Sequence, residues 1–161
     1  MKALSITIII VSLTVLSACG GGNSANSGDA APTSNSAANS SKTNIEELTM
    51  AVNVPYQLNE NDLVWKEFPS QKRIVAVMRV EQNDTARVVT DASNYGPAEA
   101  ITMPPQKWFP DELVAQAEMS GDNSLHGQSY PANAFFQEPY TNGRVTRIDG
   151  TDYFVLDVTA K

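Results

Sequence analysis

The chain has one histidine, His126, and a serine two positions before it, Ser124, so Ser-His chemistry is considered first. In a serine hydrolase, the histidine removes the proton of the serine hydroxyl while an acid orients the imidazole ring. The sequence lacks the Gly-x-Ser-x-Gly turn that exposes the nucleophile in many such enzymes. The surrounding residues, GDNSLHGQ, are polar and include glycine. We therefore expect His126 to be an exposed loop residue and not a general base.

Metal ligands are scarce. Tetrahedral zinc sites draw mainly on Cys and His, and the chain has one of each. Calcium needs clustered oxygen ligands, which only residues 121–124 and 149–152 offer over short segments. Neither segment has the spacing of an EF-hand loop, and the second is explained as a turn. The glycines at 20–22 follow no strand, so they do not form a phosphate-binding loop. We expect no metal and no cofactor.

The 18 Asp and Glu residues leave one catalytic hypothesis open. A carboxylate-based hydrolase would place two of them ~5–10 Å apart in a cleft. The sequence does not indicate which two would converge, and most acids are expected to be solvated. We rank this hypothesis last and expect a protein that is not an enzyme.

Cys19 is the only cysteine, so no internal disulfide can form. It follows a positive start, Met1-Lys2, and an apolar run over residues 3–16 that is too short to span a bilayer as a helix. The residues directly before it, Leu16-Ser17-Ala18, complete a pattern that resembles the lipobox of bacterial lipoproteins. The resemblance implies cleavage after Ala18, a diacylglyceryl thioether on Cys19, and acylation of the new amino terminus, typically with palmitate.

Two or three acyl chains anchor a protein durably, because each buried methylene contributes about 0.8 kcal/mol. Gly20 stands where an Asp commonly signals inner-membrane retention in Gram-negative lipoproteins. In an organism that has an outer membrane, the resemblance therefore implies an outer-membrane lipoprotein, with its domain in the periplasm or at the cell surface.

The composition predicts three regions: a signal peptide at 1–18, the lipidated Cys19 with a flexible tether to residue 44, and one globular domain at 45–161. Residues 20–44 contain no aromatic and no branched aliphatic side chain, and Gly, Ser, Asn and Ala dominate them. Such a segment buries too little apolar surface to offset its ordering entropy.

The net charge of −7 makes nucleic acid an unlikely partner. It also argues against membrane attachment through a basic patch. Attachment is thus expected to come from the lipid anchor.

Alternating apolar residues predict a strand from Leu48 that stops near Pro55. Further strands are predicted at 63–68, at 73–81 as a central strand, at 85–91 after a turn at 82–84, and at 99–103 within a long loop. The clearest element is a hairpin of 143–148 and 151–159 around a two-residue Asp149-Gly150 turn. That turn would pair Arg147 with Asp152 and Val145 with Phe154.

One main helix is predicted after Pro110, with acids in its first turn, an apolar stripe of Leu113, Val114 and Ala117, and an exit at Gly121. Residues 129–136 are expected to add a short helical turn. Together these elements predict an α+β fold with a small antiparallel sheet of about five or six strands and the helix packed on one face.

Aromatic residues in or beside predicted loops give the only indication of binding, namely Tyr95, Trp108, Tyr130 and Tyr140. Core packing over the open face of the sheet is the favoured interpretation for most of them, because large apolar side chains usually lie inside. The leading hypothesis is a non-catalytic envelope lipoprotein that binds another envelope protein or cell-wall material. The alternative is a small-ligand module with the 95–109 and 130–140 loops as pocket walls. The sequence does not indicate the oligomeric state.

Overall fold

The computed structural model describes residues 40–161. The predicted signal peptide, the lipobox with Cys19, and tether residues 20–39 lie outside the described residues. The elements run in the order α1 (Ile45–Ala51), β1 (Leu58–Phe68), η2 (Pro69–Gln71), β2 (Arg73–Val80), α2 (Gln82–Ser93), β3 (Glu99–Met103), α3 (Asp111–Met119), β4 (Leu125–Pro131), η3 (Asn133–Phe135), β5 (Tyr140–Ile148) and β6 (Tyr153–Ala160).

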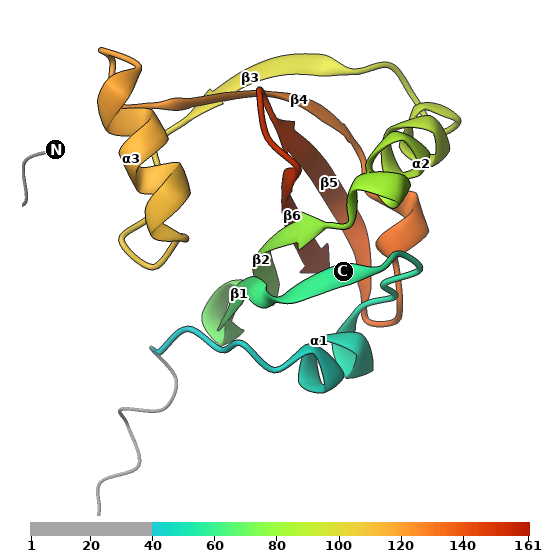
Figure 1. The fold of residues 1–161 in the computed structure, drawn as a ribbon. Helices are drawn as coiled ribbons and strands as arrows, with labels where there is room; N and C mark the ends of the chain where they lie inside the picture. The colour runs from blue at the N-terminus through green and yellow to red at the C-terminus, as the bar shows by residue number, and fades with distance from the viewer. Residues whose placement is uncertain (1–39) are drawn as a thin grey trace, which may run out of the picture. The chain divides into compact units, whose positions relative to one another are not determined.

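The six strands form one antiparallel sheet in the order β1-β2-β6-β5-β4-β3. This confirms the predicted α+β class and the small antiparallel sheet. β2 and β6 pair in the interior of the sheet, with Ala76 opposite Leu156. The β3–β4 end sweeps over the rest of the sheet, so one face is concave (Figure 1).

The two faces of the sheet carry separate cores. α1, α2 and η3 cover one face, where the buried residues include Ile74, Met78, Phe154 and Leu156. α3 and the segment before it cover part of the other face, where Val77, Leu113 and Ile148 pack together. Figure 1 shows α3 on one side of the sheet and α1 and α2 on the other. Helices therefore lie on both faces, not only on the one predicted from the sequence.

The predicted strand at Leu48–Pro55 was wrong, because this segment forms helix α1 and a loop. The side chain of Asn44 caps the helix by accepting a hydrogen bond from the backbone N–H of Glu47 at 3.0 Å. Leu48 and Val52 are buried four positions apart, whereas Met50 between them is 79 % exposed. A strand would have placed all three on one face, so the alternation in the sequence was coincidental.

The predicted turn at 82–84 and strand at 85–91 were also wrong, because residues 82–93 form α2. Thr85, Val88 and Ala92 are its buried residues, and their spacing of three and four is helical. The β-branched residues favoured a strand, but burial against the sheet decided the conformation.

The C-terminal hairpin is confirmed, but its predicted register was wrong. Arg147 pairs with Phe154 and Val145 with Leu156, so the partner moves by two residues. The connection covers 149–152, with a Thr151 N–H to Ile148 O bond of 3.3 Å. Because side chains alternate with period two, this shift keeps every side chain on its expected face. Phe154, Leu156 and Val158 accordingly share one core.

The remaining strand predictions held, with adjusted boundaries. The strand predicted at 63–68 is the end of β1, the central strand at 73–81 is β2, and 99–103 is β3. The helix after Pro110 is α3, with Leu113 and Ala117 buried, and the short helical turn is η3, although 129–131 belong to β4. Lys42, within the predicted tether, exchanges two backbone hydrogen bonds with Trp65 at 2.7 and 2.8 Å.

Candidate functional site

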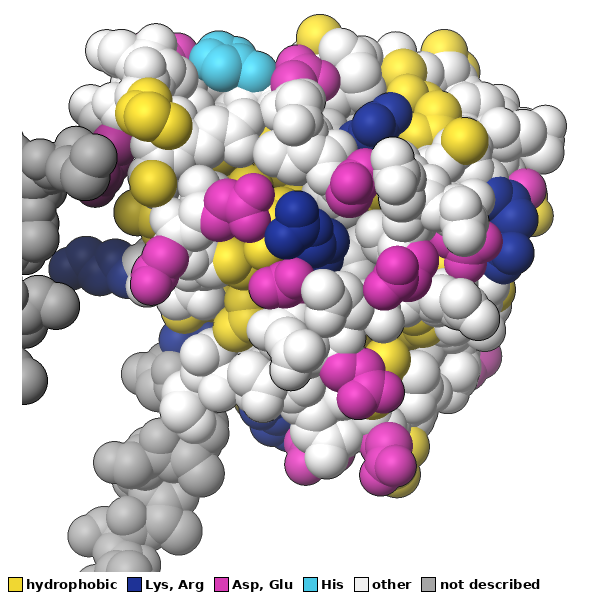
Figure 2. All heavy atoms as spheres, viewed as in Figure 1, with side chains coloured by type: hydrophobic (Ala, Val, Ile, Leu, Met, Phe, Trp, Pro, Cys, Tyr) yellow, Lys and Arg dark blue, Asp and Glu magenta, His cyan; other side chains and the backbone are white. Residues whose placement is uncertain are grey.

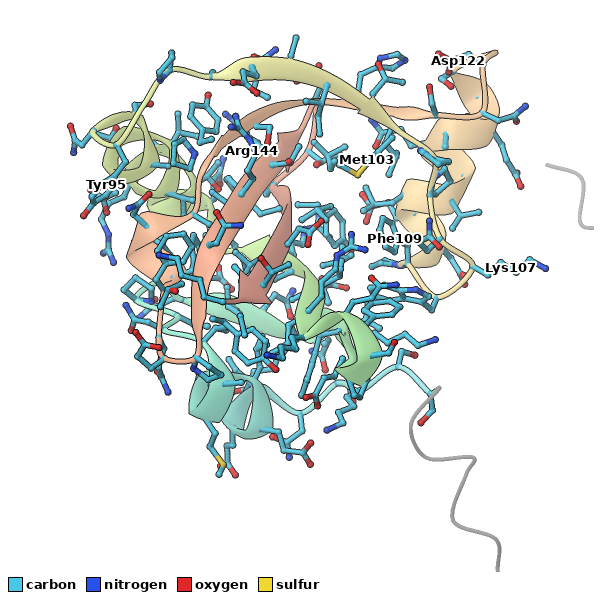
Figure 3. All side chains as sticks on the ribbon, turned by 180° about the vertical axis from the view of Figure 1, so that it is seen from behind. Tyr95, Met103, Lys107, Phe109, Asp122 and Arg144 are labelled. Carbon is cyan, nitrogen blue, oxygen red and sulfur yellow. The ribbon has the colours of Figure 1, made fainter. Side chains whose placement is uncertain are left out.

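The predicted loop position of His126 was wrong, because His126 lies on β4, paired with Thr102 of β3, although its side chain is exposed. Ser124 is buried directly before this strand, and Asp122 lies in the bend after α3 (Figure 3). His126 Nε2 is 3.2 Å from Asp122 Oδ2 and 3.5 Å from Ser124 Oγ, while its Nδ1 is 3.1 Å from Thr102 Oγ1. In a catalytic triad the acid and the serine contact opposite ring nitrogens. Here both face the same nitrogen, so the group lacks the relay geometry.

Asp122 instead organises this bend. Its Oδ1 accepts hydrogen bonds from Ser120 Oγ at 2.7 Å and from the backbone N–H of Ser124 at 3.1 Å. Hydrogen bonds from the Ser124 and Ser120 side chains lower the pKa of Asp122 to about 2. The arrangement is that of a helix exit fixed by local side-chain bonds.

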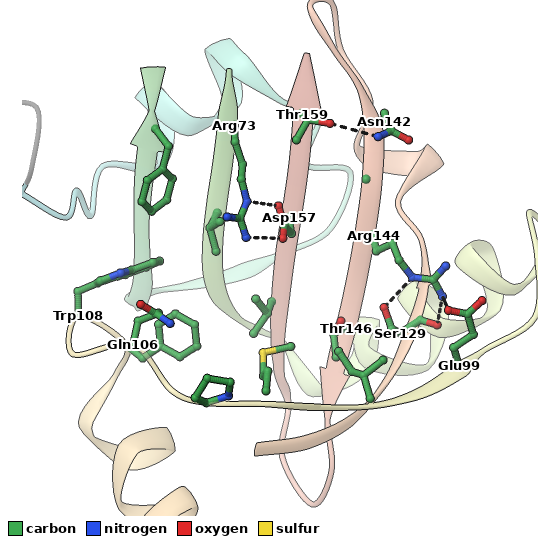
Figure 4. Close-up of a pocket in the computed structure, with 18 residues that line it drawn as sticks. Arg73, Glu99, Gln106, Trp108, Ser129, Asn142, Arg144, Thr146, Asp157 and Thr159 are labelled. Atoms are coloured by element: carbon green, nitrogen blue, oxygen red, sulfur yellow. Dashed lines mark hydrogen bonds and ion pairs between the residues drawn. The ribbon is translucent and has the colours of Figure 1, made fainter. Parts of the chain in front are cut away.

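A cavity of about 590 Å³ lies on the concave face of the sheet, beside the part that α3 covers. Strands β2, β6 and β5 form its floor, β3 and β4 one wall, and the 104–109 segment the other wall (Figure 4). We call this cavity the sheet groove. Its lining residues are Phe68, Arg73, Val75, Glu99, Ile101, Met103, Pro104, Gln106, Trp108, Phe109, Ser129, Asn142, Gly143, Arg144, Thr146, Val155, Asp157 and Thr159.

Arg73 and Asp157 form a bidentate ion pair on the groove floor. Arg73 Nε donates to Asp157 Oδ1 and Arg73 NH2 to Oδ2, both at 2.7 Å. The strand register brings them together, because Arg73 on β2 pairs with Thr159 and Val75 with Asp157. The hydrogen bonds that Arg73 donates to Asp157 raise the pKa of the guanidinium above its usual value, so it stays charged. Both side chains are partly exposed, so the pair remains open to the groove.

Arg144 is held at the other side of the floor by β4 and β3. Its Nε donates to Ser129 Oγ at 2.9 Å, and its NH2 donates to Ser129 O at 2.7 Å. The same NH2 is 3.1 Å from Glu99 Oε2. Ser129 is only 2 % exposed, so one end of this network is anchored inside the sheet. These bonds fix the orientation of the guanidinium at the groove surface.

Aromatic residues form the wall opposite β3. The rings of Trp108 and Phe109 meet edge to face, with centroids 4.8 Å apart and planes at 79°. Phe109 is buried, and it holds the half-buried Trp108 against the groove. Phe68 lies at the same end, with the Arg73 guanidinium carbon 5.6 Å from its ring centre. Rings fixed in this way offer apolar surface without a large loss of side-chain entropy on binding.

Uncharged polar groups complete the lining. Asn142 Nδ2 donates to Thr159 Oγ1 at 3.2 Å, across β5 and β6. Thr146 is 3 % exposed and lines the floor between them and α3. The backbone carbonyl of Gln106 accepts a hydrogen bond from the backbone N–H of Phe109. The side chain of Gln106 is exposed on the rim. The groove therefore offers apolar surface and convergent hydrogen-bonding groups together.

Of the four aromatic residues singled out from the sequence, the structure places only Trp108 in the sheet groove. Tyr95 is 57 % exposed after α2, away from Phe109 and Met103 (Figure 3). Tyr130 is buried in the core beneath α2. Tyr140 packs against that core, where burial and the neighbouring Glu67 raise the pKa of its hydroxyl. The two loops do not face each other as pocket walls.

The groove residues missed by sequence reasoning are those carried by strands. Arg73 and Asp157 were counted as strand residues, although Asp157 interrupts an apolar run of the kind that fills both sides of a buried strand, and Arg73 begins such a run. A charged side chain at such a position indicates an uncovered part of the sheet face. No such signal marked Arg144, Ser129 and Glu99, because their proximity depends on the register of β3, β4 and β5.

Within residues 40–161, no helix is long and apolar enough to cross a membrane. In the same range, no three His, Cys, Asp or Glu side chains come together as metal ligands. Acidic side chains are spread over the face seen in Figure 2, with Lys and Arg between them. No family model matches the chain, and no similar curated protein or solved structure was found.

Proposed function

We propose that this protein is a non-catalytic envelope lipoprotein that binds a small polar ligand in the sheet groove. The observation that supports the proposal is the groove itself, a cavity of about 590 Å³ with one aromatic wall and a polar floor. Ligand sites are typically concave, of ~300–1,000 Å³, with apolar walls and a few fixed polar groups. The proposed anchor is the acylated Cys19, which lies outside the described residues.

Ligand binding is favoured over docking to a protein partner by the exposed surface. Large hydrophobic side chains that are strongly exposed among residues 40–161 are Met50, Tyr95 and Met119, which lie on or after three different helices. Protein-docking sites more often expose a continuous apolar patch. The groove concentrates its apolar surface in a concavity, as a small-ligand site does.

The groove carboxylates support a binding role over hydrolysis. Asp157 is bonded twice to Arg73, and Glu99 to Arg144. A general acid needs a protonated carboxyl group, whereas an adjacent guanidinium favours the ionised form.

The binding proposal is tested by nuclear magnetic resonance with the full-length lipidated protein and a fragment library. The chain has two tryptophans, so two indole N–H signals are expected. Trp108 lines the groove, whereas Trp65 is 2 % exposed and donates through Nε1 to Asn44 O at 3.1 Å. Fragments that occupy the groove shift the Trp108 signal and leave the Trp65 signal in place.

A blocking variant sharpens this test. Thr159→Phe adds a ring to the groove floor, and Thr90→Phe adds the same ring to the exposed surface of α2. We expect the first variant to abolish the Trp108 shifts and the second to preserve them. A library that never perturbs Trp108, or perturbs it equally in Thr159→Phe, would overturn the binding proposal.

The anchor is tested separately by metabolic labelling with a palmitate analogue. Cys19→Ser removes the only thiol, so we expect labelling to disappear and the protein to leave the membrane fraction. Ser17→Cys combined with Cys19→Ser is the control, because it keeps one cysteine in the same segment but displaces it from the lipobox spacing. Labelling that persists in Cys19→Ser would contradict the anchor.

A further inference from the structure

The side chains that line the sheet groove carry equal numbers of positive and negative charges. Among its lining residues, two arginines, Arg73 and Arg144, face two carboxylates, Asp157 and Glu99, and no lysine takes part. Each arginine is bonded to one of these carboxylates, at 2.7 Å and 3.1 Å. A charged ligand would approach a like charge within the same cavity, which costs binding free energy. The groove therefore favours a ligand without net charge.

The paired ions still offer hydrogen bonds. A carboxylate has about four acceptor positions and a guanidinium five N–H donors. Asp157 uses two of its positions on Arg73, and Arg144 donates through Nε and NH2. Acceptors and donors thus lie side by side on a partly exposed floor. A hydroxyl group both donates and accepts, so a ligand rich in hydroxyls matches this floor better than one that only donates or only accepts.

The aromatic wall supplies the complementary surface. Trp108 is held by its edge-to-face contact with Phe109, and Phe68 also lines the groove. A flat face of aliphatic C–H groups packs on such a ring, because the ring face is electron-rich and apolar. A pyranose ring has both features, C–H groups on its faces and hydroxyls around its edge.

We propose that the sheet groove binds a neutral oligosaccharide, with one sugar ring packed on Trp108 and its hydroxyls bonded to the Arg73–Asp157 pair. This inference rests on the ligand-binding function proposed above. The amide of Asn142 and the hydroxyl of Thr159 extend the polar floor away from the tryptophan. The Figure 4 view shows the ion pair between these groups and Trp108, so a chain of sugar units can contact all of them.

The experiment is calorimetric titration of the full-length protein with three soluble oligosaccharides of equal length. These are a β-1,4-linked N-acetylglucosamine tetramer, a β-1,4-linked glucose tetramer and an anionic galacturonate tetramer. The detergent must be zwitterionic, because sugar-headed detergents would compete for the groove. We expect at least one neutral tetramer to bind and the galacturonate to bind at least tenfold more weakly.

Two variants link binding to the groove. Trp108→Ala should weaken binding of the neutral tetramer about tenfold, and Trp108→Phe should restore part of the affinity because it keeps a ring. Asp157→Asn should also weaken binding, since it removes acceptor strength and loosens Arg73. Tyr95→Ala is the matched control, because Tyr95 is exposed and does not line the groove.

The outcomes separate the two proposals. Affinity for a neutral tetramer that depends on Trp108 but not on Tyr95 supports the inference. Tighter binding of the galacturonate, binding that Trp108→Ala leaves unchanged, or no binding of any tetramer would overturn it. If fragments still shift the Trp108 indole signal in those cases, the ligand-binding function stands and only the saccharide class is wrong.

Discussion

The two faces of the sheet are covered by helices to different extents. Beneath α1, α2 and η3 the face is closed, and Ile74, Leu156 and Val158 on its strands are fully buried. On the other face α3 covers only the end that contains Val77 and Ile148, and the rest forms the sheet groove. Neighbouring residues of one strand thus have different roles: in β6, Leu156 fills the closed core while Asp157 faces the groove.

This difference indicates how a domain of this size can hold a site without internal disulfides. The closed face supplies most of the apolar burial that stabilises the fold. The open half can then carry Arg73, Asp157 and Arg144, which would weaken a closed core. If this division is correct, substitutions of apolar side chains on the closed face should reduce stability, and substitutions of the polar side chains on the groove floor should reduce binding with little loss of stability.

The largest expected effect is at Phe154, which is 1 % exposed on the closed face. Phe154→Ala should lower the free energy of unfolding by about 3–5 kcal/mol, because it leaves a cavity in a packed core. Its neighbour Val155 lines the groove but is 4 % exposed and packs in the core on the α3 side, so Val155→Ala should cost about 1–2 kcal/mol for the loss of two methyl groups. Urea denaturation followed by circular dichroism measures both values, and equal losses would contradict the division.

Gly143 lines the groove floor, and replacing it with alanine should reduce stability strongly. It has a φ of +150°, and a Cβ there would lie 2.1 Å from Asp157 O and 2.7 Å from Val158 Cα. Gly143→Ala should therefore cost about 2–5 kcal/mol, from close contact and backbone strain together. Gly150, at φ +74° with no atom within 4 Å of the Cβ position, is the matched control.

Gly150→Ala should cost about 1–2 kcal/mol, from backbone strain alone. Thermal unfolding of the two variants in parallel separates strain from contact. If both glycine variants melt at the same temperature, the close approach of β5 and β6 at Gly143 adds nothing to the stability cost of a Cβ there.

The ion pair on the groove floor should contribute little to stability. Asp157→Asn should change the free energy of unfolding by less than about 1 kcal/mol, since both partners are partly exposed and Arg73 can be hydrated. Urea denaturation at low and high salt checks this value, which should decrease further as salt screens the pair. A loss as large as that of Phe154→Ala would show that the floor is part of the core.

The smallest effect concerns Asp122, at the exit of α3. Its pKa in the folded protein is about 2, below the usual 3.8, so it stabilises the folded state above about pH 4. This contribution is lost as the pH falls from about 4 to about 2. Carbon-detected nuclear magnetic resonance of the carboxyl signal measures the pKa directly.

Removing both hydroxyls with Ser120→Ala and Ser124→Ala should raise the pKa of Asp122 toward its usual value. The groove signals, including the Trp108 indole, should not move during this titration. An Asp122 that titrates at its usual value in the unaltered protein would contradict the hydrogen-bonded bend.

The class of fold, β2, β3, the helix after Pro110 and the presence of the C-terminal hairpin could all be predicted from the amino-acid sequence. These elements have strong local signals: continuous apolar runs, a proline and acids at a helix start, and Asp-Gly between two strands. Lys42 was assigned to the tether because its short segment is polar, but its pairing with Trp65 depends on a strand far along the chain.

The conformation of 45–51 and 82–93 depends on packing in the folded domain, and so does the site. Both segments have patterns compatible with a strand, and packing against the sheet made them helices. The groove depends on the strand register and on the curvature that brings β3 over β5, which no local pattern encodes. Trp108 could be singled out because aromatic residues are informative alone, whereas Arg73 and Asp157 acquire their role only by lying side by side on adjacent strands.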